Sequence, residues 1–320
     1  MKKIIGIGET ILDILFKENQ PVKAVPGGSV FNSIVSLGRM GCNAALVSEV
    51  GSDRVGSMVV DFLAGNGVDV SSVYRFRDAK SPVSLAFLNE NNDAEYMFYK
   101  ESADDHLQIE FPQIEADDIV IYGSYFVLNK QLRPKVKAFL EYAHSCGAIL
   151  YYDVNFRKNH EDEKLKIAEA LIENLELADI VRGSIDDFKV LYGCDDADKI
   201  YNSNIKFYCP NFICTHGGEG VKLFTRGFTA TYDVPTVKVV SSVGAGDNFN
   251  AGVVYGIQKD AVSREEIGSF TKEQWDRIIK CGLDFSAHAC TLVDNYVEQE
   301  WADNYKACES VVENQPLTHC

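Results

Sequence analysis

Apolar runs rich in β-branched residues alternate with stretches of helical pattern along most of this 320-residue chain. The runs predict buried strands at 3–8, 44–50, 118–123, 148–154, 178–183 and 211–217. The helical stretches lie between them, near 28–41, 54–66, 130–146, 161–176 and 185–192. This alternation is typical of an α/β fold in which helices cover both faces of a mostly parallel central sheet.

Two segments interrupt the alternation. Residues 9–19 and 81–100 carry short strand-like patterns with no helix between the strands. The second segment predicts a hairpin that turns at 89–93, where Asn and Asp tolerate turn dihedrals. We therefore expect a single domain over 1–320 that carries a small β-sheet lid, formed by segments at about 9–19 and 81–102.

The overall charge limits the classes of partner. The chain has 31 Lys and Arg against 47 Asp and Glu, a formal net charge of −16 at pH 7. A surface this acidic repels nucleic acid and anionic membrane, so we expect neither as a partner. An anionic substrate would have to be held by locally placed donors.

Cysteine usage and the start of the chain indicate a cytoplasmic protein. The nine Cys are odd in number, scattered, and never arranged as C-x-x-C, which is typical of reduced thiols. Neither Cys nor His shows the spacing of metal ligands, which argues against a catalytic zinc. Glu9 and Asp13 interrupt the first apolar run, so it predicts neither a signal peptide nor a membrane span.

The stretch SSVGAGDNFNAG at 241–252 has the strongest chemical signal. Apolar residues recur at helical spacing after it, so GAGD marks the start of a helix in a largely helical last third. Unpaired N–H groups at a helix start attract anions, and glycines let an anion approach the backbone. The predicted anion cradle consists of Gly244, Ala245 and Gly246.

Asp247 stands beside this cradle and has two interpretations. Nucleotide phosphates in the cradle would raise its basicity, and it would then take a proton from a substrate hydroxyl that attacks phosphorus. Alternatively, Asp247 only caps the helix.

A second glycine-rich stretch, VPGGSVFNSIVSLGRMG, covers 25–41. Gly27 and Gly28 precede a predicted helix, and Asn32 lies in its first turns. A double glycine permits close backbone approach, and the Asn amide can both donate to and accept from a hydroxyl. The alternative is a simple turn followed by a cap.

Two further stretches follow predicted strands. YYDVNFRKN (151–159) places Asp153, Asn155 and Arg157 at alternate positions, which point the same way on an extended segment. Arg157 is a candidate for neutralising a transferring phosphoryl group, or else a surface Arg paired with an acid. CTHGGEGVKLF (214–224) predicts a strand, a Gly-rich turn and another strand, which either borders a nucleotide or is a plain tight turn.

Two superficial motifs are rejected. GSDRVGS (51–57) lacks the Lys of a P-loop. GIGETI (6–11) lacks the third Gly of a dinucleotide fingerprint and has no acid near position 28, which argues against a nicotinamide site.

Taken in order, these motifs resemble the PfkB (ribokinase-like) family of carbohydrate kinases over essentially the whole chain. The resemblance rests on the GG-plus-Asn element, GSDRVG, the D-x-N-x-R element at 153–157, the Gly-rich turn at 217–220, and GAGD. The stretch at 81–107 looks most like the lid of the fructokinase branch.

The resemblance implies a ribokinase-like fold and transfer of the γ-phosphoryl group of ATP, with Mg²⁺, to a sugar hydroxyl. In that family pattern Asp247 is the base, the amides of Gly244, Ala245 and Gly246 form the anion hole, and Arg157 reaches the phosphates. The remaining implied roles are sugar binding by Asp13, Gly27, Gly28 and Asn32, nucleotide binding by Ser184, Thr215, Gly217, Gly218 and Gly220, and magnesium organisation through water by Asn155 and Asp187.

The chain departs from the family pattern at two places. Ser241 and Ser242 stand where the family usually has Asp-Thr, which leaves activation by a monovalent cation such as potassium uncertain. The family's N-x-x-E element appears as Ser184 and Asp187, a change that predicts weaker metal affinity.

A cytoplasmic fructokinase is the function we expect, and three rivals stay open. Lys100, at the end of the predicted lid hairpin, would suit the carboxylate of 2-keto-3-deoxygluconate, and the fold also serves nucleosides. A non-catalytic sugar sensor is favoured by the serines at 184 and 241 and disfavoured by the retained Asp247 and Arg157.

Exposed lid strands also make a homodimer plausible, through apolar residues among Val83, Leu85, Phe87, Tyr96 and Phe98.

Overall fold

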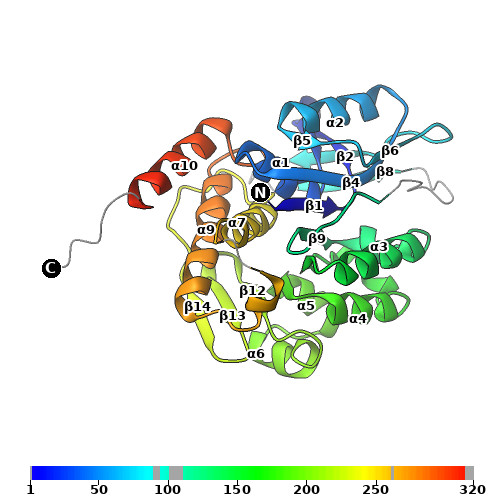
Figure 1. The fold of residues 1–320 in the computed structure, drawn as a ribbon. Coiled ribbons are helices and arrows are strands. Elements are labelled where there is room, and N and C mark those ends of the chain that lie inside the picture. The colour runs from blue at the N-terminus through cyan, green and yellow to red at the C-terminus, as the bar shows by residue number, and fades with distance from the viewer. Residues whose placement is uncertain (1, 89–93, 101–110, 261–262, 314–320) are drawn as a thin grey trace.

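The computed structural model describes residues 2–88, 94–100, 111–260 and 263–313 (Figure 1). Its main sheet has ten strands in the order β14-β13-β12-β11-β10-β9-β1-β4-β5, with β6 paired to β4. The strands are β1 (Lys3–Ile7), β4 (Asn43–Gly51), β5 (Val68–Asp69), β6 (Val73–Phe76), β9 (Ile119–Gly123), β10 (Ile149–Asp153), β11 (Ile180–Ser184), β12 (Phe212–Thr215), β13 (Val221–Phe224) and β14 (Thr229–Tyr232). All pairs are parallel except β12–β13 and β13–β14, so the six predicted strands and the mostly parallel sheet are confirmed.

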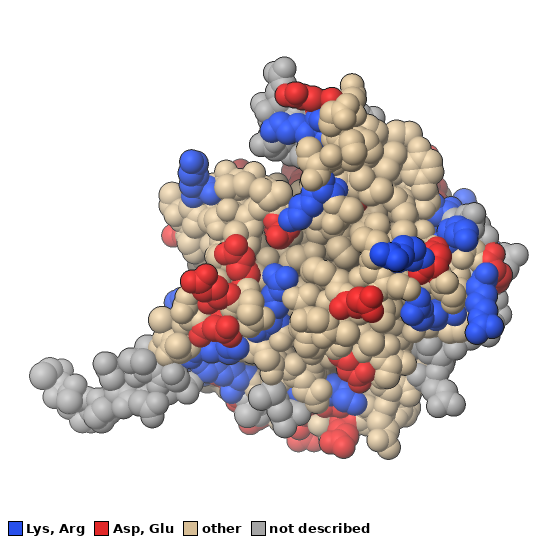
Figure 2. Space-filling view, turned by 90° about the horizontal axis from the view of Figure 1, so that it is seen from above, with Lys and Arg blue, Asp and Glu red and all other residues tan. Residues whose placement is uncertain are grey.

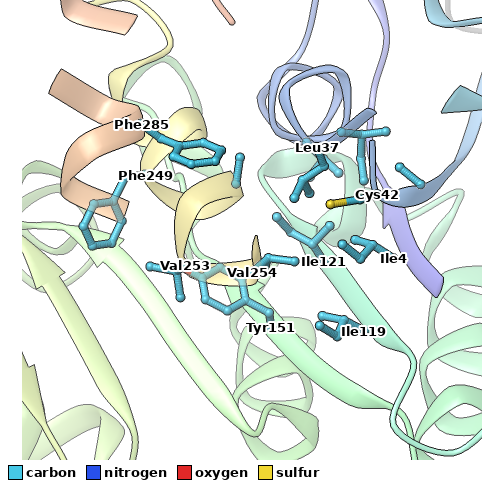
Figure 3. Packing of buried hydrophobic residues seen from close by; sticks show 14 of the residues in the cluster. Ile4, Leu37, Cys42, Ile119, Ile121, Tyr151, Phe249, Val253, Val254 and Phe285 are labelled. Carbon is cyan, nitrogen blue, oxygen red and sulfur yellow. The ribbon is translucent and has the colours of Figure 1, made fainter. Parts of the chain in front are cut away.

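Helices cover both faces of this sheet. They are α1 (Ser29–Arg39), α2 (Arg54–Gly65), α3 (Arg133–Ser145), α4 (Ala168–Leu177), α5 (Ile185–Tyr192), α6 (Ala197–Ile200), α7 (Ala245–Lys259), α8 (Arg264–Ile267), α9 (Lys272–Cys290) and α10 (Gln299–Glu313). Residues of one strand face opposite layers: Ile4 packs in the core with α1, α7 and α9, whereas Ile5 packs in the core with α3 and α4 (Figures 1 and 3). Burial on both faces explains why these strands are continuously apolar.

The helix predicted at 161–176 is wrong over residues 161–167, about its first two turns. Residues Lys158–Glu163 form a 3₁₀ helix, and α4 begins only at Ala168. The stretch 158–163 offers no apolar face to bury, whereas Ala170, Leu171 and Leu175 pack in the core. Helices of this size are stabilised mainly by packing, so the helix starts where its apolar stripe starts.

The lid is a separate four-stranded sheet in the order β3-β2-β7-β8. Its strands are β2 (Ile11–Lys17), β3 (Gln20–Gly27), β7 (Val83–Leu88) and β8 (Ala94–Tyr99). The pairing of β2 with β7 is parallel, and β7 and β8 pair antiparallel, while the turn predicted at 89–93 lies outside the described residues.

Strand β3 was not predicted. It contains Pro21 and Pro26, and its first five residues are exposed, so it lacks an apolar alternation. Proline is tolerated there because β3 lies at the edge of the lid sheet. The turn into β3 uses positive φ at Glu18 and Asn19, which produces a tight two-residue hairpin.

The described helices include none that is both long and apolar enough to cross a membrane. Acidic and basic side chains are intermixed on the face that Figure 2 shows.

Candidate active site

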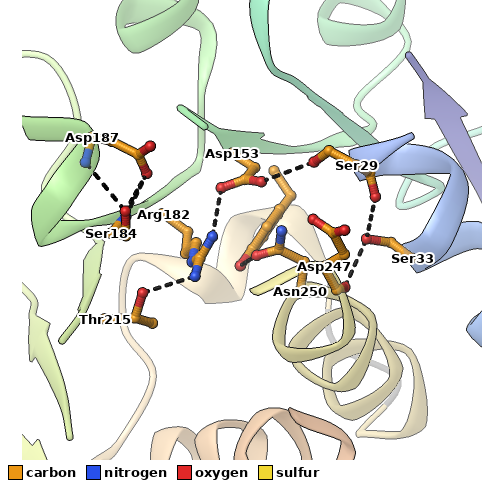
Figure 4. A network of polar contacts seen from close by, with 10 residues as sticks. Ser29, Ser33, Asp153, Arg182, Ser184, Asp187, Thr215, Asp247 and Asn250 are labelled. Atoms are coloured by element: carbon orange, nitrogen blue, oxygen red, sulfur yellow. Dashed lines mark hydrogen bonds and ion pairs between the residues drawn. The ribbon is translucent and has the colours of Figure 1, made fainter. Parts of the chain in front are cut away.

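The start of α7 lies at the carboxyl-end edge of the parallel strands, beside the ends of β10, β11 and β12 (Figure 4). Gly244 precedes the helix in a left-handed conformation, with φ 78°. A Cβ atom there would lie 2.7 Å from the carbonyl oxygen of Asn295, so only glycine fits. The N–H of Ala245 donates to Ser242, whereas the described residues supply no acceptor for the N–H of Gly246. The backbone at Gly246 is therefore ready to donate to an anion.

Asp247 is buried in the first turn of α7 and is held from α1. The side-chain amide of Asn32 donates to its carboxylate at 2.8 Å, and the Ser33 hydroxyl donates to its carbonyl oxygen at 2.7 Å. Burial raises the pKa of Asp247 to about 6, Asn32 lowers it, Asp153 raises it, and Arg157 and Arg182 lower it. A carboxylate in this state accepts a proton near neutral pH.

Three polar side chains converge on Gly27, where β3 meets α1. A Cβ atom on Gly27 would lie 3.0 Å from Oδ2 of Asp13 and 3.7 Å from both Oδ1 of Asn32 and Nδ2 of Asn295. Gly28 has φ 136°, and a Cβ there would lie 2.2 Å from the Glu9 carbonyl oxygen.

The groups around Gly27 are suited to hydroxyls. Oδ1 of Asn32 is buried and has no hydrogen-bond donor among the described residues. Burial raises the pKa of Asp13 to about 6, the Ser84 hydroxyl that donates to it lowers the pKa, and Glu9 raises it. Acceptors and donors set around bare glycine backbone can bind a ligand with several hydroxyl groups.

Asp153 and Arg182 form a buried ion pair, with Nη1 of Arg182 3.0 Å from Oδ1 of Asp153 (Figure 4). The other terminal nitrogen of Arg182 donates to the hydroxyl of Thr215 at 2.7 Å. Ser29 lies at the start of α1, and its hydroxyl donates to the other oxygen of Asp153 at 3.4 Å. The ends of β10, β11 and β12 are thereby linked to α1.

Asn155 and Arg157 do not continue an extended segment, so the expectation that 153, 155 and 157 point the same way is wrong. Asn155 is buried with φ 35°, in the left-handed region, which turns the chain after Asp153. Arg157 is exposed, yet its charge still lowers the pKa of Asp247.

Asp187 belongs to a capping box at the start of α5. Its Oδ2 accepts from the N–H of Ser184 at 2.7 Å and from the Ser184 hydroxyl at 2.8 Å. Burial and the charge of Asp153 raise the pKa of Asp187, while Arg182 and Ser184 lower it. The cap explains why Ser and Asp occupy these positions, and Oδ1 is left for a second partner.

The fit to a metal ion follows from this donor set. The described residues contain no group of three or more acidic, His or Cys side chains able to cage a metal ion. Mg²⁺ usually keeps several waters and binds through one or two carboxylates plus phosphate oxygens, so Asp187 with the amide of Asn155 suits that mode.

The Gly-rich turn has the predicted form. Thr215 ends β12, residues Gly217–Glu219 form a 3₁₀ turn, and β13 returns antiparallel. Gly217 and Gly220 have φ of 56° and 122°, and no described atom lies within 4 Å of a Cβ on Gly217 or Gly218. Gly217 and Gly218 therefore present open backbone at the carboxyl-end edge of the sheet, where Arg182 also lies.

Lys100 lies in an ion pair with Glu9, 2.6 Å apart. Both groups are partly exposed, so the ammonium of Lys100 is already balanced by a carboxylate at the end of the lid.

Two cavities of about 250 Å³ each border the turn at 225–228 and contain none of these residues. That turn follows β13 at the opposite, amino-end edge of the parallel strands. The carboxyl-end edge is the candidate active site, because Asp247, the glycine backbone at the start of α7 and the guanidinium of Arg182 are gathered there.

Sequence reasoning missed Arg182, Ser33 and Asn295. Arg182 has the visible signal of a charge inside an apolar strand, which calls for a buried partner. Ser33 and Asn295 give no such signal, because Ser33 binds Asp247 and Asn295 borders Gly27 and Gly244, all of which lie far from them in the chain.

Comparison with known proteins agrees with this geometry. Residues 1–299 match the model of the pfkB family carbohydrate kinases. Fructokinase-1 of Zea mays is 28% identical over 283 residues, which cover 82% of this chain and 85% of that protein.

Solved structures share the fold. The fructokinase of Vibrio cholerae O395, solved with fructose, ADP and calcium bound, superposes with a TM-score of 0.83 at 20% identity, covering 95% of this chain and 99% of that one. The aminoimidazole riboside kinase of Salmonella enterica gives a TM-score of 0.80 at 20% identity, covering 95% and 99%. The fold is ribokinase-like, and the chain belongs to the pfkB family of carbohydrate kinases.

Proposed function

We propose that this protein transfers the γ-phosphoryl group of ATP to a hydroxyl of fructose. The observation that carries the proposal is the placement of Asp247: a buried carboxylate with a raised pKa, at the first turn of a helix whose glycine backbone can hold an anion. Relatives named fructokinase support the choice of sugar.

The chain's own residues account for each part of the transfer. Asp13, Asn32 and Asn295 orient the sugar over Gly27. The attacking hydroxyl gives its proton to the Asp247 carboxylate while its oxygen bonds to the γ-phosphorus and the bond to the ADP oxygen breaks. In this proposal, the negative charge of the transferring phosphate is stabilised by the backbone of Gly244, Ala245 and Gly246 and by the side chain of Arg157.

Magnesium belongs to the proposal as the ion that neutralises the nucleotide phosphates. Asp187 and Asn155 would hold it through water, and Ser184, Thr215, Gly217, Gly218 and Gly220 would border the nucleotide. Position 241 holds a Ser, whose hydroxyl accepts from the N–H of Val243. This position therefore lacks the carboxylate that the family usually has there, near a monovalent cation.

The ion pair of Lys100 with Glu9 favours fructose over 2-keto-3-deoxygluconate. A substrate carboxylate would have to compete with Glu9 for the ammonium group and would meet the negative charges of Glu9 and Asp13. Lys100 then contributes to lid closure rather than to recognition of an anion.

A substrate panel tests the proposal. Purified protein with ATP and Mg²⁺ should release ADP with fructose at a kcat/KM at least about tenfold above that with 2-keto-3-deoxygluconate, ribose or a nucleoside. If none of these substrates causes ADP release but fructose binds measurably, the result would instead support the non-catalytic sugar sensor. A preference for the acid or the nucleoside would move the assignment to that class.

We also propose that the chain forms a single domain and that its lid is the contact surface of a homodimer. Strands β2 and β3 run directly from β1 into α1, which supports one domain. Strand β8 lies at the sheet edge, with 49% of Met97 and 56% of Tyr99 exposed. Light scattering should give twice the chain mass, reduced to a monomer by Met97→Lys with Tyr99→Lys.

A cytoplasmic location completes the proposal. Its support is that none of the eight described cysteines forms a disulfide, as expected in a reducing compartment.

A further inference from the structure

Among the described residues, the side chain of Arg182 lies nearest to Gly246 at the start of α7. A Cβ atom on Gly246 would lie 2.9 Å from Nη2, 3.1 Å from Nη1 and 3.4 Å from Cζ of Arg182. The flat guanidinium group therefore lies directly against Gly246, and any larger residue at 246 would displace it.

The position of this guanidinium is fixed on several sides. Asp153 binds one terminal nitrogen and Thr215 the other, and Phe249 lies 5.8 Å from Cζ, measured to its ring centre. Only 6% of Arg182 is exposed. Arg157, by contrast, is exposed, and its side chain makes no hydrogen bond or ion pair within the described parts of the chain.

One donor of Arg182 is unused. Its Nε is buried without an acceptor among the described residues. A buried, unpaired donor is costly, and a structure retains one where a ligand or water satisfies it. The unused donor and the contact with Gly246 both point to an anion on this side of the helix start.

Charge balance supports the same conclusion. Burial alone would lower the pKa of Arg182, but the Asp153 carboxylate raises it, so the guanidinium stays protonated. Without Arg182, Asp153 would leave an uncompensated negative charge beside the helix start, where it would repel phosphate.

We propose that Arg182 is a positioning residue that supports the phosphate-binding backbone of α7 from beneath Gly246 and supplies a fixed positive charge there. It acts through Gly246 and by neutralising Asp153, while the exposed Arg157 is free to follow the transferring group. The inference rests on the proposed kinase function, because it takes nucleotide phosphate as the anion.

Equilibrium binding separates this role from a general structural one. Kd values for ATP, ADP, AMP and fructose are measured by calorimetry on the full chain. Arg182→Gln should weaken ATP and ADP by roughly 10- to 100-fold, as expected for loss of a charge-assisted interaction, and change fructose less than about threefold. Arg277→Gln, a surface Arg paired with Asp260, is the matched control and should change nothing.

Two further variants cover the case in which Arg182→Gln fails to fold. Arg182→Lys keeps the charge but cannot bridge Asp153 and Thr215 together, so its ATP affinity should fall between those of wild type and Arg182→Gln. Asp153→Asn with Arg182→Gln removes both charges, and should recover part of the ATP affinity if repulsion from Asp153 contributes.

The outcomes are distinguishable. A wild type that fails to bind ATP would contradict the kinase proposal itself. A wild type that binds ATP, together with folded Arg182 variants that bind ATP equally well or that lose fructose and ATP in equal measure, would overturn the role of Arg182.

Discussion

Asn32 and Asp247 lie 215 positions apart in the chain, and the side-chain amide of Asn32 donates to the Asp247 carboxylate at 2.8 Å. The amide oxygen of Asn32 is buried without a donor among the described residues, on the side where Asp13 and Asn295 converge. The side chain of Asn32 thus contacts both Asp247 and the surroundings of the proposed sugar. It couples the proposed proton transfer to sugar binding.

Asp247→Asn removes the proton acceptor and keeps the shape. Turnover should fall by roughly 10²- to 10⁴-fold, because a neutral amide cannot take the hydroxyl proton. The Kd for fructose should stay within a few-fold of wild type. Near-normal turnover in initial-rate assays would exclude Asp247 as the base.

The pH dependence of kcat/KM should show an acid limb near pH 6. Asp247 and Asp13 both have pKa values raised to about 6, mainly by burial, so both lose their charge as the pH falls through that value. The rate should therefore fall by more than about tenfold per pH unit below 6. Asp13→Asn should leave a limb of about tenfold per unit, and a flat profile down to pH 5 would contradict the assignment.

Asn32→Ala should move this acid limb to higher pH. The hydrogen bond from Asn32 lowers the pKa of Asp247, so its loss leaves the carboxylate easier to protonate. Ser33→Ala is the control, because that hydroxyl donates to the Asp247 carbonyl and not to the carboxylate. The two variants should differ in pH–rate profiles, and identical profiles would count against the role of Asn32.

Asp247 should also make the protein less stable above pH 6. Its folded pKa of about 6 lies above the unfolded value of 3.8, so the folded state holds a proton that the unfolded state has released between these values. Its favourable contribution is present at low pH and is lost as the pH rises through 6. Asp247→Asn lacks this loss and should be more stable than wild type at pH 7.5, by up to about 3 kcal/mol.

Urea unfolding at two pH values tests this prediction. The difference between variant and wild type in free energy of unfolding should shrink toward zero near pH 4. A difference that is equal at pH 4 and pH 7.5 would show that packing, rather than ionisation, is responsible.

Gly28→Ala should destabilise the fold by about 2–4 kcal/mol, through the positive φ and the overlap with the Glu9 carbonyl. Gly65→Ala is the matched control, since no described atom lies within 4 Å of its Cβ and its φ is not in the left-handed region. Thermal melts of the two variants should separate clearly, and equal melting temperatures would show that the backbone at Gly28 can relax.

Most of the fold was predictable because its strands are buried on both faces. Continuous apolar runs such as Ile149–Asp153 give a strong local signal. Strand β3 gave none, since an exposed edge strand with two prolines needs no apolar pattern. Its pairing with β2 is decided by the tight turn at Glu18 and Asn19, a backbone property that the pattern does not report.

The site was predictable where a residue acts through its own backbone or its immediate neighbours. Gly244 and Gly28 are glycines because of positive φ and close approach, and the sequence shows both. The contact of Ser33 with Asp247 and that of Asn295 with Gly27 were not readable, because nothing local to Ser33 or Asn295 reports which distant segment packs on it. Arg157 was singled out by its place after a strand, and its role with the phosphates stays a prediction. The contact of Arg182 with Gly246 was not visible in the sequence, because the two residues are distant in the chain.

The side chains around Gly27 come from positions 13, 32 and 295, and the backbone of Asn295 also lies against Gly244. During synthesis, a nascent chain that already contains GAGD therefore still lacks Asn295. The surroundings of Gly27 and Gly244 are complete only after residue 295 has been added and has folded back onto them.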